Sequence, residues 1–253
     1  MDAKNSKSNK RIIGFMVCGG GEAKRWLPQV LEQRSKIVDD MIICLNNGTS
    51  AERKLINRFG YWHYNDDREW GIYQPQIKQD LLEKVARLRP DWILAADADE
   101  IYDKNFTREA AEKLMSVNTV GYYFAIINLW GDELHYRHDA SFWNIRFWDY
   151  KEASKYGLQF ERKRLHCGLA PPIVYKFALH APFMVKHYGL MLPEDRKQKA
   201  ARYDKYDPKA QFRGKEFYDK LRDNPKVNNF DENVMHQRVE NDVASYKEII
   251  KKP

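Results

Sequence analysis

The chain has 253 residues, of which 43% are hydrophobic and 31% are charged. This hydrophobic content excludes a disordered chain, and the length suits one large domain or one domain with an elaborated tail. The net charge of +7 at pH 7 favours acidic partners such as phosphates, nucleic acid or an anionic membrane surface. It does not choose among them, and it also suits a role in solubility alone.

The cysteines and the apolar runs of the sequence indicate in which cellular compartment the protein is found. Cys18, Cys44 and Cys167 are too few for a disulfide framework, which fits a reducing compartment. Cys18 and Cys44 lie near the ends of apolar runs, so we expect buried thiols there. The first residues are polar and basic without an apolar leader, and no run approaches the roughly 20 apolar residues of a membrane span. We therefore expect a cytoplasmic protein.

The first hundred residues alternate between strand-like and helix-like patterns. Residues 1–10 are expected to be a disordered lead-in. Short apolar runs predict buried strands at 11–18, 41–45, 61–64 and 92–96. Helical patterns separate them at 22–33, at 50–59 behind a Thr49–Glu52 capping box, and up to Leu88 with Pro75 in the first turn. This alternation predicts a parallel sheet with helices on its faces.

The second half has a different character. We expect a helix at 107–115, aromatic strands at 121–130 and 141–148 separated by a polar stretch, irregular chain at 150–175, a strand at 177–188 and a helix at 193–206. The aromatic strands would close a substrate cleft. Residues 207–253 are strongly charged and are expected to be helical in pieces.

Residues 92–100, which read WILAADADE, join a buried strand to three carboxylates. The acids Asp97, Asp99 and Glu100 follow the carboxyl end of the strand, where open α/β sheets place their ligands. Three acids within four residues repel one another, and a divalent cation such as Mg²⁺ or Mn²⁺ would hold them together. The alternative from spacing alone is an acidic loop.

Four features in series resemble the family 2 glycosyltransferases with a GT-A fold. They are Glu22, Arg25, Leu27 and Pro28 after the first strand; the VDDMII strand leading to Asn46-Asn47-Gly48-Thr49-Ser50; the PDWIL strand leading to DADE; and Lys186-His187-Tyr188-Gly189 before a charged helix. Two stretches depart from the pattern. The second strand ends in LNNGT where the family has an aspartate, and the first ends in VCGGG instead of a TxN-like sequence.

The resemblance implies an α/β fold of GT-A type, a Rossmann-like, mostly parallel sheet flanked by helices with added C-terminal strands and helices. Residues 11–206 would form one catalytic domain, with the nucleotide-sugar half at 11–100 and the acceptor half at 101–206, and residues 207–253 would form a helical extension. By the same resemblance Asp99 and His187 would bind Mn²⁺ or Mg²⁺, and Asp97 would contact the metal or the ribose. The donor would be a UDP- or GDP-sugar, and the acceptor a saccharide or another hydroxyl compound.

Further contacts follow from the resemblance and from the chemistry of sugar transfer. The expected nucleotide contacts are Cys18, Gly19, Asn46, Arg68, Gln76 and Lys78. An inverting reaction needs a base for the acceptor hydroxyl, for which the candidates are Asp132, Glu133 and Asp139. Sugar rings pack on aromatic side chains, so the aromatic residues around this loop suit a saccharide, and core packing is their ordinary alternative. They are Trp130, Tyr136, Trp143 and Trp148.

Two other functions remain open from the sequence. Cys18–Pro28 faintly resembles the glycine-rich loop of sugar-phosphate nucleotidyltransferases, whose backbone would cradle a triphosphate at a helix start. In a different class, the basic stretches 196–202 and 209–226 suit a non-catalytic protein that binds nucleic acid or an anionic surface. Acids interleave with these bases and no specific nucleic-acid motif is present, so the same region could instead hold a transferase at a membrane or a polyanion.

Overall fold

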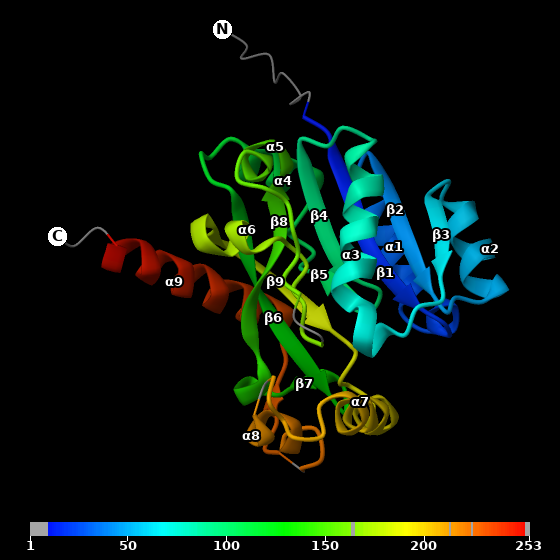
Figure 1. Ribbon diagram of the computed structural model, residues 1–253. Helices are drawn as coiled ribbons and strands as arrows, with labels where there is room; N and C mark the ends of the chain where they lie inside the picture. The colour runs from blue at the N-terminus through cyan, green and yellow to red at the C-terminus, as the bar shows by residue number, and fades with distance from the viewer. Residues whose placement is uncertain (1–9, 163–164, 213, 224, 251–253) are drawn as a thin grey trace, which may run out of the picture.

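The computed structural model describes residues 10–162, 165–212, 214–223 and 225–250 (Figure 1). Apart from Lys10, the expected lead-in at 1–10 lies outside the described residues. Four parallel strands form one half of a mixed sheet in the order β3-β2-β1-β4. Their bounds are β1 (Ile12–Gly19), β2 (Asp40–Asn46), β3 (Trp62–Asp66) and β4 (Trp92–Asp97). The predicted parallel arrangement is confirmed.

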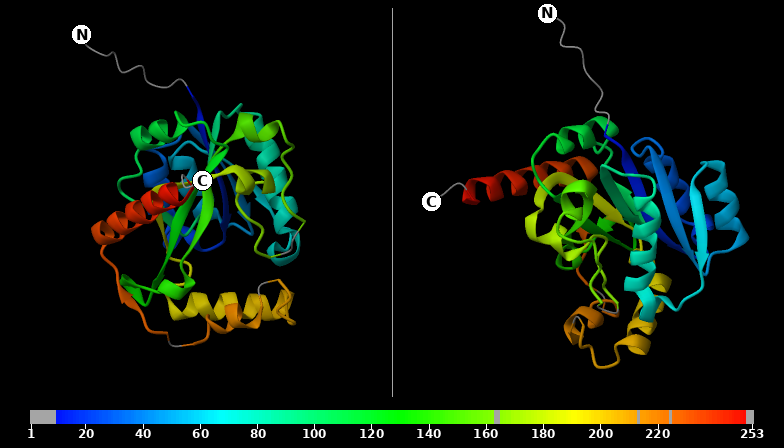
Figure 2. Two further views of the ribbon diagram at one scale, coloured as in Figure 1. Left: turned by 90° about the vertical axis from the view of Figure 1, so that its left-hand side faces the viewer. Right: turned by 45° about the horizontal axis from the view of Figure 1, so that its top comes forward.

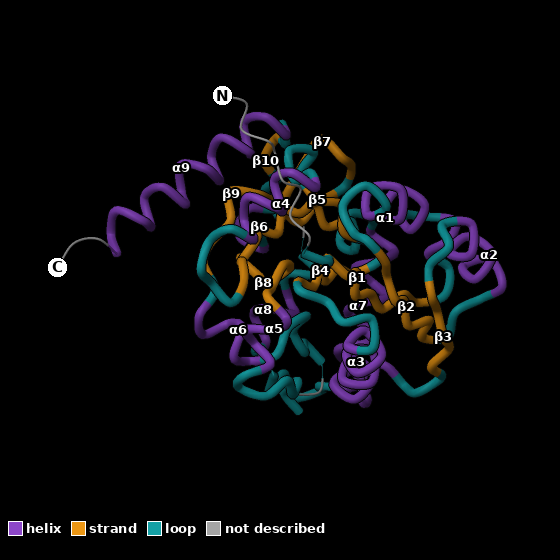
Figure 3. Tube along the Cα trace, turned by 90° about the horizontal axis from the view of Figure 1, so that it is seen from above, coloured by secondary structure: helices purple, strands orange, loops and turns teal. Residues whose placement is uncertain are grey.

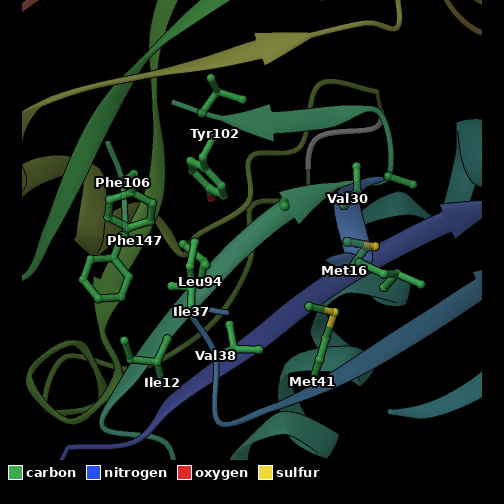
Figure 4. Packing of buried hydrophobic residues seen from close by; sticks show 14 of the residues in the cluster. Ile12, Met16, Val30, Ile37, Val38, Met41, Leu94, Tyr102, Phe106 and Phe147 are labelled. Atoms are coloured by element: carbon green, nitrogen blue, oxygen red, sulfur yellow. The ribbon is translucent and has the colours of Figure 1, made fainter. Parts of the chain in front are cut away.

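Helices cover both faces of these strands (Figure 3). The helices of this half are α1 (Leu27–Arg34), α2 (Ser50–Arg58) and α3 (Trp70–Ala86). Because successive strand residues point to opposite faces, Ile12 and Met16 belong to the core cluster that contains residues of α1 and α2, whereas Ile13 and Phe15 belong to the cluster that contains residues of α3. Figure 4 shows Met16 beside Val30 of α1. Burial on both faces explains why these strands are apolar without alternation.

Two predicted helix boundaries differ from the structure. The expected helix at 22–33 is divided into a 3₁₀ turn, η1 (Glu22–Lys24), and α1. The turn is separate because Glu52 Oε1 accepts hydrogen bonds from the backbone N–H groups of Gly21 and Ala23, at 3.0 and 2.9 Å. Helix α3 begins at Trp70, so Pro75 lies inside it rather than in its first turn. A proline there removes only one backbone hydrogen bond, the one that residue 75 would donate to residue 71.

The second half extends the sheet with antiparallel and crossing strands. Strand β8 pairs antiparallel with β4 and β6, and β9 pairs parallel with β6 and antiparallel with β5. The stretch expected as a polar separator contains a strand, β7, because Leu129 and Tyr136 pair across a tight turn. The bounds are β5 (Glu100–Tyr102), β6 (Gly121–Trp130), β7 (Asp132–Tyr136), β8 (Phe142–Asp149), β9 (Leu179–His187) and β10 (Asn228–Asn229).

The helices of the second half lie on both faces of the sheet. Their bounds are α4 (Arg108–Met115), α5 (Tyr150–Ser154), α6 (Pro172–Phe177), α7 (Pro193–Tyr206), α8 (Lys215–Asp219) and α9 (Glu232–Ile250). The segment expected to be irregular at 150–175 thus contains α5 and the start of α6. Helix α4 packs in the same core cluster as α1, and α5 and α6 pack in the cluster of α3. Figure 2 shows α7 lying across the foot of the molecule and α9 projecting to one side. In the described part of the chain, no helix has the length and apolar character needed to cross a membrane.

Candidate active site

The strand order predicts a ligand-binding crevice between the ends of β1 and β4. The chain runs from β1 to β2 and β3 on one side, and β4 then returns to the other side of β1. Ligands of open α/β sheets bind outside the carboxyl ends of the strands at such a switch point. Val17 and Asp97 are paired across this point. The turn of residues 97–100 and the loop of residues 19–25 therefore border the crevice.

Asp99 and His187 meet at this edge although they are far apart in the sequence. Strand β5 pairs with β9 so that Glu100 lies opposite His187, and Tyr188 N donates to Asp99 O at 2.9 Å. His187 Nε2 consequently lies 3.4 Å from Asp99 Oδ2. Burial alone would raise the pKa of Asp99, but the charge and hydrogen bond of His187 outweigh it, and Lys199 adds to their effect, so this pKa lies below its usual range.

Asn128 fixes the orientation of the His187 ring. Asn128 Nδ2 donates to Ala140 O, which leaves its Oδ1 to accept a hydrogen bond from His187 Nδ1 at 2.5 Å. When the ring is neutral, this hydrogen bond keeps its proton on Nδ1, and the Nε2 lone pair then faces Asp99. An outer partner that sets the tautomer in this way is a regular feature of metal-binding histidines.

Gly189 keeps the space between these two side chains open. A Cβ atom at Gly189 would lie far inside van der Waals contact of Asp99 Oδ2 and 2.9 Å from His187 Nε2. This space suits a divalent cation, because it is bordered by a carboxylate oxygen and an imidazole nitrogen and no side chain of residue 189 fills it. Among the described residues, no group of three or more His, Cys, Asp or Glu side chains is arranged to hold a metal ion. Two protein ligands match Mg²⁺-type sites in which substrate phosphates supply further oxygens.

Buried charges hold the acidic turn from behind. Arg146 Nε donates to Glu100 Oε2 at 2.7 Å, and its Nη2 donates to Glu100 Oε1; both side chains are almost fully buried. Glu100 Oε2 also accepts the Asp97 N–H at 3.3 Å, and Arg34 Nη2 donates to Glu100 O at 3.0 Å. Burial, followed by the charge of Glu100, raises the pKa of Asp97. Glu100 thus shapes the turn instead of facing the crevice.

The loop after β1 brings groups that the sequence reasoning did not assign to the site. Burial, helped by the negative charge of Asp99 and opposed by Arg25, raises the pKa of Glu22 to about 7. Glu22 Oε2 is buried and has no hydrogen-bond partner among the described residues. Arg25 forms an ion pair with Asp195 of α7 and lies 3.8 Å from Glu22 Oε1. Glu22 and Arg25 were part of the recognised pattern, but no sequence signal indicated Asp195.

The predicted nucleotide contacts around β1 to β3 are mostly engaged within the protein. The Cys18 thiol is buried in the core, as expected, whereas Gly19 is exposed at the end of β1. Asn46 Nδ2 donates to Asp66 O at 2.9 Å and to Arg68 O at 2.8 Å, so it organises the loop after β3. The Arg68 guanidinium binds the carboxylates of Asp66 and Asp80.

Gln76 and Lys78 of α3 differ in their exposure to solvent. Gln76 is exposed, whereas Lys78 is buried and its Nζ donates to Cys167 O at 2.6 Å and to Gly168 O at 3.0 Å. Burial lowers the pKa of Lys78, and the nearby Cys167 and Asp97 oppose this. The lysine therefore anchors the 167–168 segment beside the acidic turn.

The three candidate bases differ in what they contact. Asp132 Oδ1 lies 2.7 Å from His135 Nδ1, and Asp139 forms ion pairs with Arg137 and Lys220. Glu133 instead faces Tyr188: burial, followed by the charge and hydrogen bond of Glu133 among other groups, raises the pKa of this tyrosine. Glu133 is thus the acid of this set that contacts Tyr188, the residue after His187.

The aromatic residues flanking this loop divide between core and surface. Trp148 and Tyr136 are buried in core clusters, and Trp130 is buried against Arg137 and Arg196, whose guanidinium carbons lie 4.9 and 4.1 Å from its ring centroid. Trp143 is partly exposed. Core packing thus accounts for three of the four.

Comparison with known proteins shows a likeness of fold and none of sequence. No family model matches the sequence, and neither does any curated protein. TarS of S. aureus superposes with a TM-score of 0.51 at 8% identity, over 78% of this chain and 40% of TarS. TarS 1-349 in complex with UDP matches with a TM-score of 0.49 at 9% identity, over 78% and 66% of the two chains. A nucleotidyl transferase from Methanothermobacter thermautotroptrophicus matches with a TM-score of 0.34 at 13% identity, over 70% and 87%.

The first of these matches establishes the fold. The chain has a GT-A-like fold, a mostly parallel mixed α/β sheet flanked by helices, which confirms the fold expected from the sequence. It spans about 40% of the length of TarS.

Proposed function

We propose that the chain is a metal-dependent glycosyltransferase that moves a sugar from a nucleoside-diphosphate donor to a hydroxyl acceptor such as a saccharide. The observation that carries the proposal is the convergence of Asp99 and the oriented His187 at the switch point of a GT-A-like sheet. A transfer enzyme of this kind must hold a diphosphate where negative charge develops as the sugar leaves. The resemblance of the DADE segment to the family 2 enzymes supports the same assignment.

The protein side chains have distinct parts in this proposal. Asp99 and His187 would hold Mn²⁺ or Mg²⁺, which would act as a Lewis acid toward the departing diphosphate. Asn128 keeps the proton of His187 on Nδ1, so Nε2 stays available as a ligand. The positive charge of Lys199 lies close enough to Asp99 to lower its pKa, and it would also attract the diphosphate.

Glu133 is the base that we propose for the acceptor hydroxyl. It is exposed, and it contacts Tyr188 beside His187, whereas Asp132 and Asp139 are engaged by His135 and Arg137. This assignment implies an inverting reaction. We expect Glu133→Gln to lower kcat while leaving donor affinity unchanged; a lowered donor affinity with unchanged kcat would contradict it.

One set of contacts in the glycine-rich loop supports the proposal over the nucleotidyltransferase alternative. That reaction needs free backbone N–H groups in the glycine-rich loop to cradle a triphosphate. In this chain the N–H groups of Gly21 and Ala23 both donate to Glu52 Oε1. Glu52 would have to leave these donors before phosphate oxygens could replace it.

The proposal is tested by donor binding and product analysis. We expect UDP- or GDP-sugars to bind in the presence of Mn²⁺, with binding lost in chelator, and turnover to release a nucleoside diphosphate. Asp99→Asn should weaken this binding by at least about tenfold, because even the loss of an outer metal partner has this effect. Asp219→Asn, at an exposed position on α8, is the matched control and should bind normally. Release of pyrophosphate from a nucleoside triphosphate and a sugar phosphate would overturn the proposal in favour of the nucleotidyltransferase.

A further inference from the structure

A groove with a volume of about 390 Å³ lies on the outer side of η1, where it meets α2. Its lining consists of three cations and a floor of small or apolar side chains: Ala23, Lys24, Ala51, Lys54, Leu55 and Arg58. We call it the α2 groove. Helix α2 lies at the end of the molecule beside β3 (Figure 1). In a 3₁₀ turn residues three apart share a side, so Glu22 and Arg25 share a side of η1 and adjoin the candidate active site, while Ala23 and Lys24 line the groove.

The cations of the α2 groove are not neutralised. Lys24, Lys54 and Arg58 are exposed, and within the described chain no carboxylate lies at ion-pair distance from them. Lys54 and Arg58 are moreover four residues apart on one helix, a spacing at which like charges destabilise the helix. Lysines elsewhere in the chain are paired with acids at this spacing: Lys36 and Lys113 lie 2.8 and 2.9 Å from Glu32 and Glu109.

The groove is held in shape by a buried carboxylate. Glu52 is fully buried beneath it and accepts hydrogen bonds from Gly21 N, Ala23 N and Thr49 N at 3.0, 2.9 and 2.7 Å. These bonds fix η1 against the first turn of α2, so Lys24 lines the same groove as Lys54 and Arg58. The negative charge of Glu52 is directed inward and satisfied by these donors, which leaves the rim positive.

We propose that the α2 groove is a second anion site that binds a phosphate-bearing ligand through Lys24, Lys54 and Arg58. Three uncompensated cations from two elements repel one another in the free protein, and a phosphate group between them relieves that repulsion and gains charge-assisted hydrogen bonds. The lining of the groove includes neither Asp99 nor His187, and the proposal does not depend on the proposed transferase reaction.

The site can be tested by calorimetric titration of the full chain with pyrophosphate. A chelator is present so that metal-dependent binding at the candidate active site does not contribute. We expect the wild-type chain to bind, and Lys54→Ala/Arg58→Ala to lose on the order of tenfold in affinity, as is typical for lost hydrogen bonds to charged groups. The double variant Lys36→Ala/Lys113→Ala removes the same charge elsewhere and should lose less than about twofold. Circular dichroism verifies that both variants fold. Absence of wild-type binding, or equal losses in the two variants, would overturn the proposal.

A second arm distinguishes the source of the phosphate. Co-sedimentation with phosphatidylcholine vesicles that contain phosphatidic acid, lost in Lys54→Ala/Arg58→Ala but not in Lys36→Ala/Lys113→Ala, would identify a lipid headgroup. Binding of pyrophosphate without co-sedimentation would identify a soluble phosphate ester. The two results both support an anion site. UDP binding with Mn²⁺, measured on the same variants, reports the active site independently, so failure of one proposal leaves the other intact.

Discussion

Replacing Arg146 with methionine tests how the acidic turn is held. The Arg146 and Glu100 side chains are 3% and 2% exposed, so the variant would leave a buried carboxylate without its ion-pair partner. Such a loss costs about 3–5 kcal/mol of folding free energy. Glu100 would keep the Asp97 N–H as a donor and the positive charge of Arg34 nearby, so we expect a value near the lower end, about 3 kcal/mol. Because the same carboxylate shapes the turn that carries Asp99, Mn²⁺-dependent donor binding should weaken as well.

Urea unfolding of Arg146→Met, Glu100→Gln and the double variant measures this effect. We expect the double variant to recover most of the stability lost by Arg146→Met, because it leaves no unpaired buried charge. Arg222→Met, which breaks an exposed ion pair with Asp204, is the control and should cost less than about 1 kcal/mol. A loss for Arg146→Met no larger than that of the control, or a double variant no more stable than Arg146→Met, would refute the reasoning.

Three further changes test the site and its surroundings. Glu22 binds its proton more tightly in the folded chain, with a pKa raised from 4.5 to about 7, so its contribution to stability falls as pH rises through this window. In chelator, Glu22→Gln should therefore stabilise the protein by about 3 kcal/mol above pH 7 and by nothing near pH 4. A difference in urea unfolding that does not depend on pH would contradict this. Gly189→Ala should abolish Mn²⁺-dependent donor binding, since its Cβ would collide with Asp99; unchanged calorimetric binding would show that this space is not needed. Gly71→Ala should loosen α7, because its Cβ would collide with the Tyr206 ring, and unaltered hydrogen exchange of the α7 amides would exclude this.

Local patterns in the sequence were sufficient for most of the elements. The strand β6 and the helix α7 have the bounds expected from aromatic content and from Pro193, and the Thr49–Glu52 capping box is present at the start of α2. These features depend on residues that are near one another in the chain. The errors occurred where a distant residue intervened: Glu52 separates η1 from α1 by binding the N–H groups of Gly21 and Ala23, about 30 positions away.

The sequence alone determined that a buried strand ends in Asp97 and Asp99 at the ligand-binding edge of a parallel sheet, because strand periodicity and β-α alternation are local properties. Only the tertiary structure decided which side chains meet Asp99. His187 reaches it through the pairing of β5 with β9, and Asn128 sets the tautomer of the ring from a third strand. Burial likewise decided that Lys78 anchors neighbouring backbone. Contacts between strands that are distant in sequence depend on which strands are neighbours in the sheet, and no local spacing of residues encodes that arrangement.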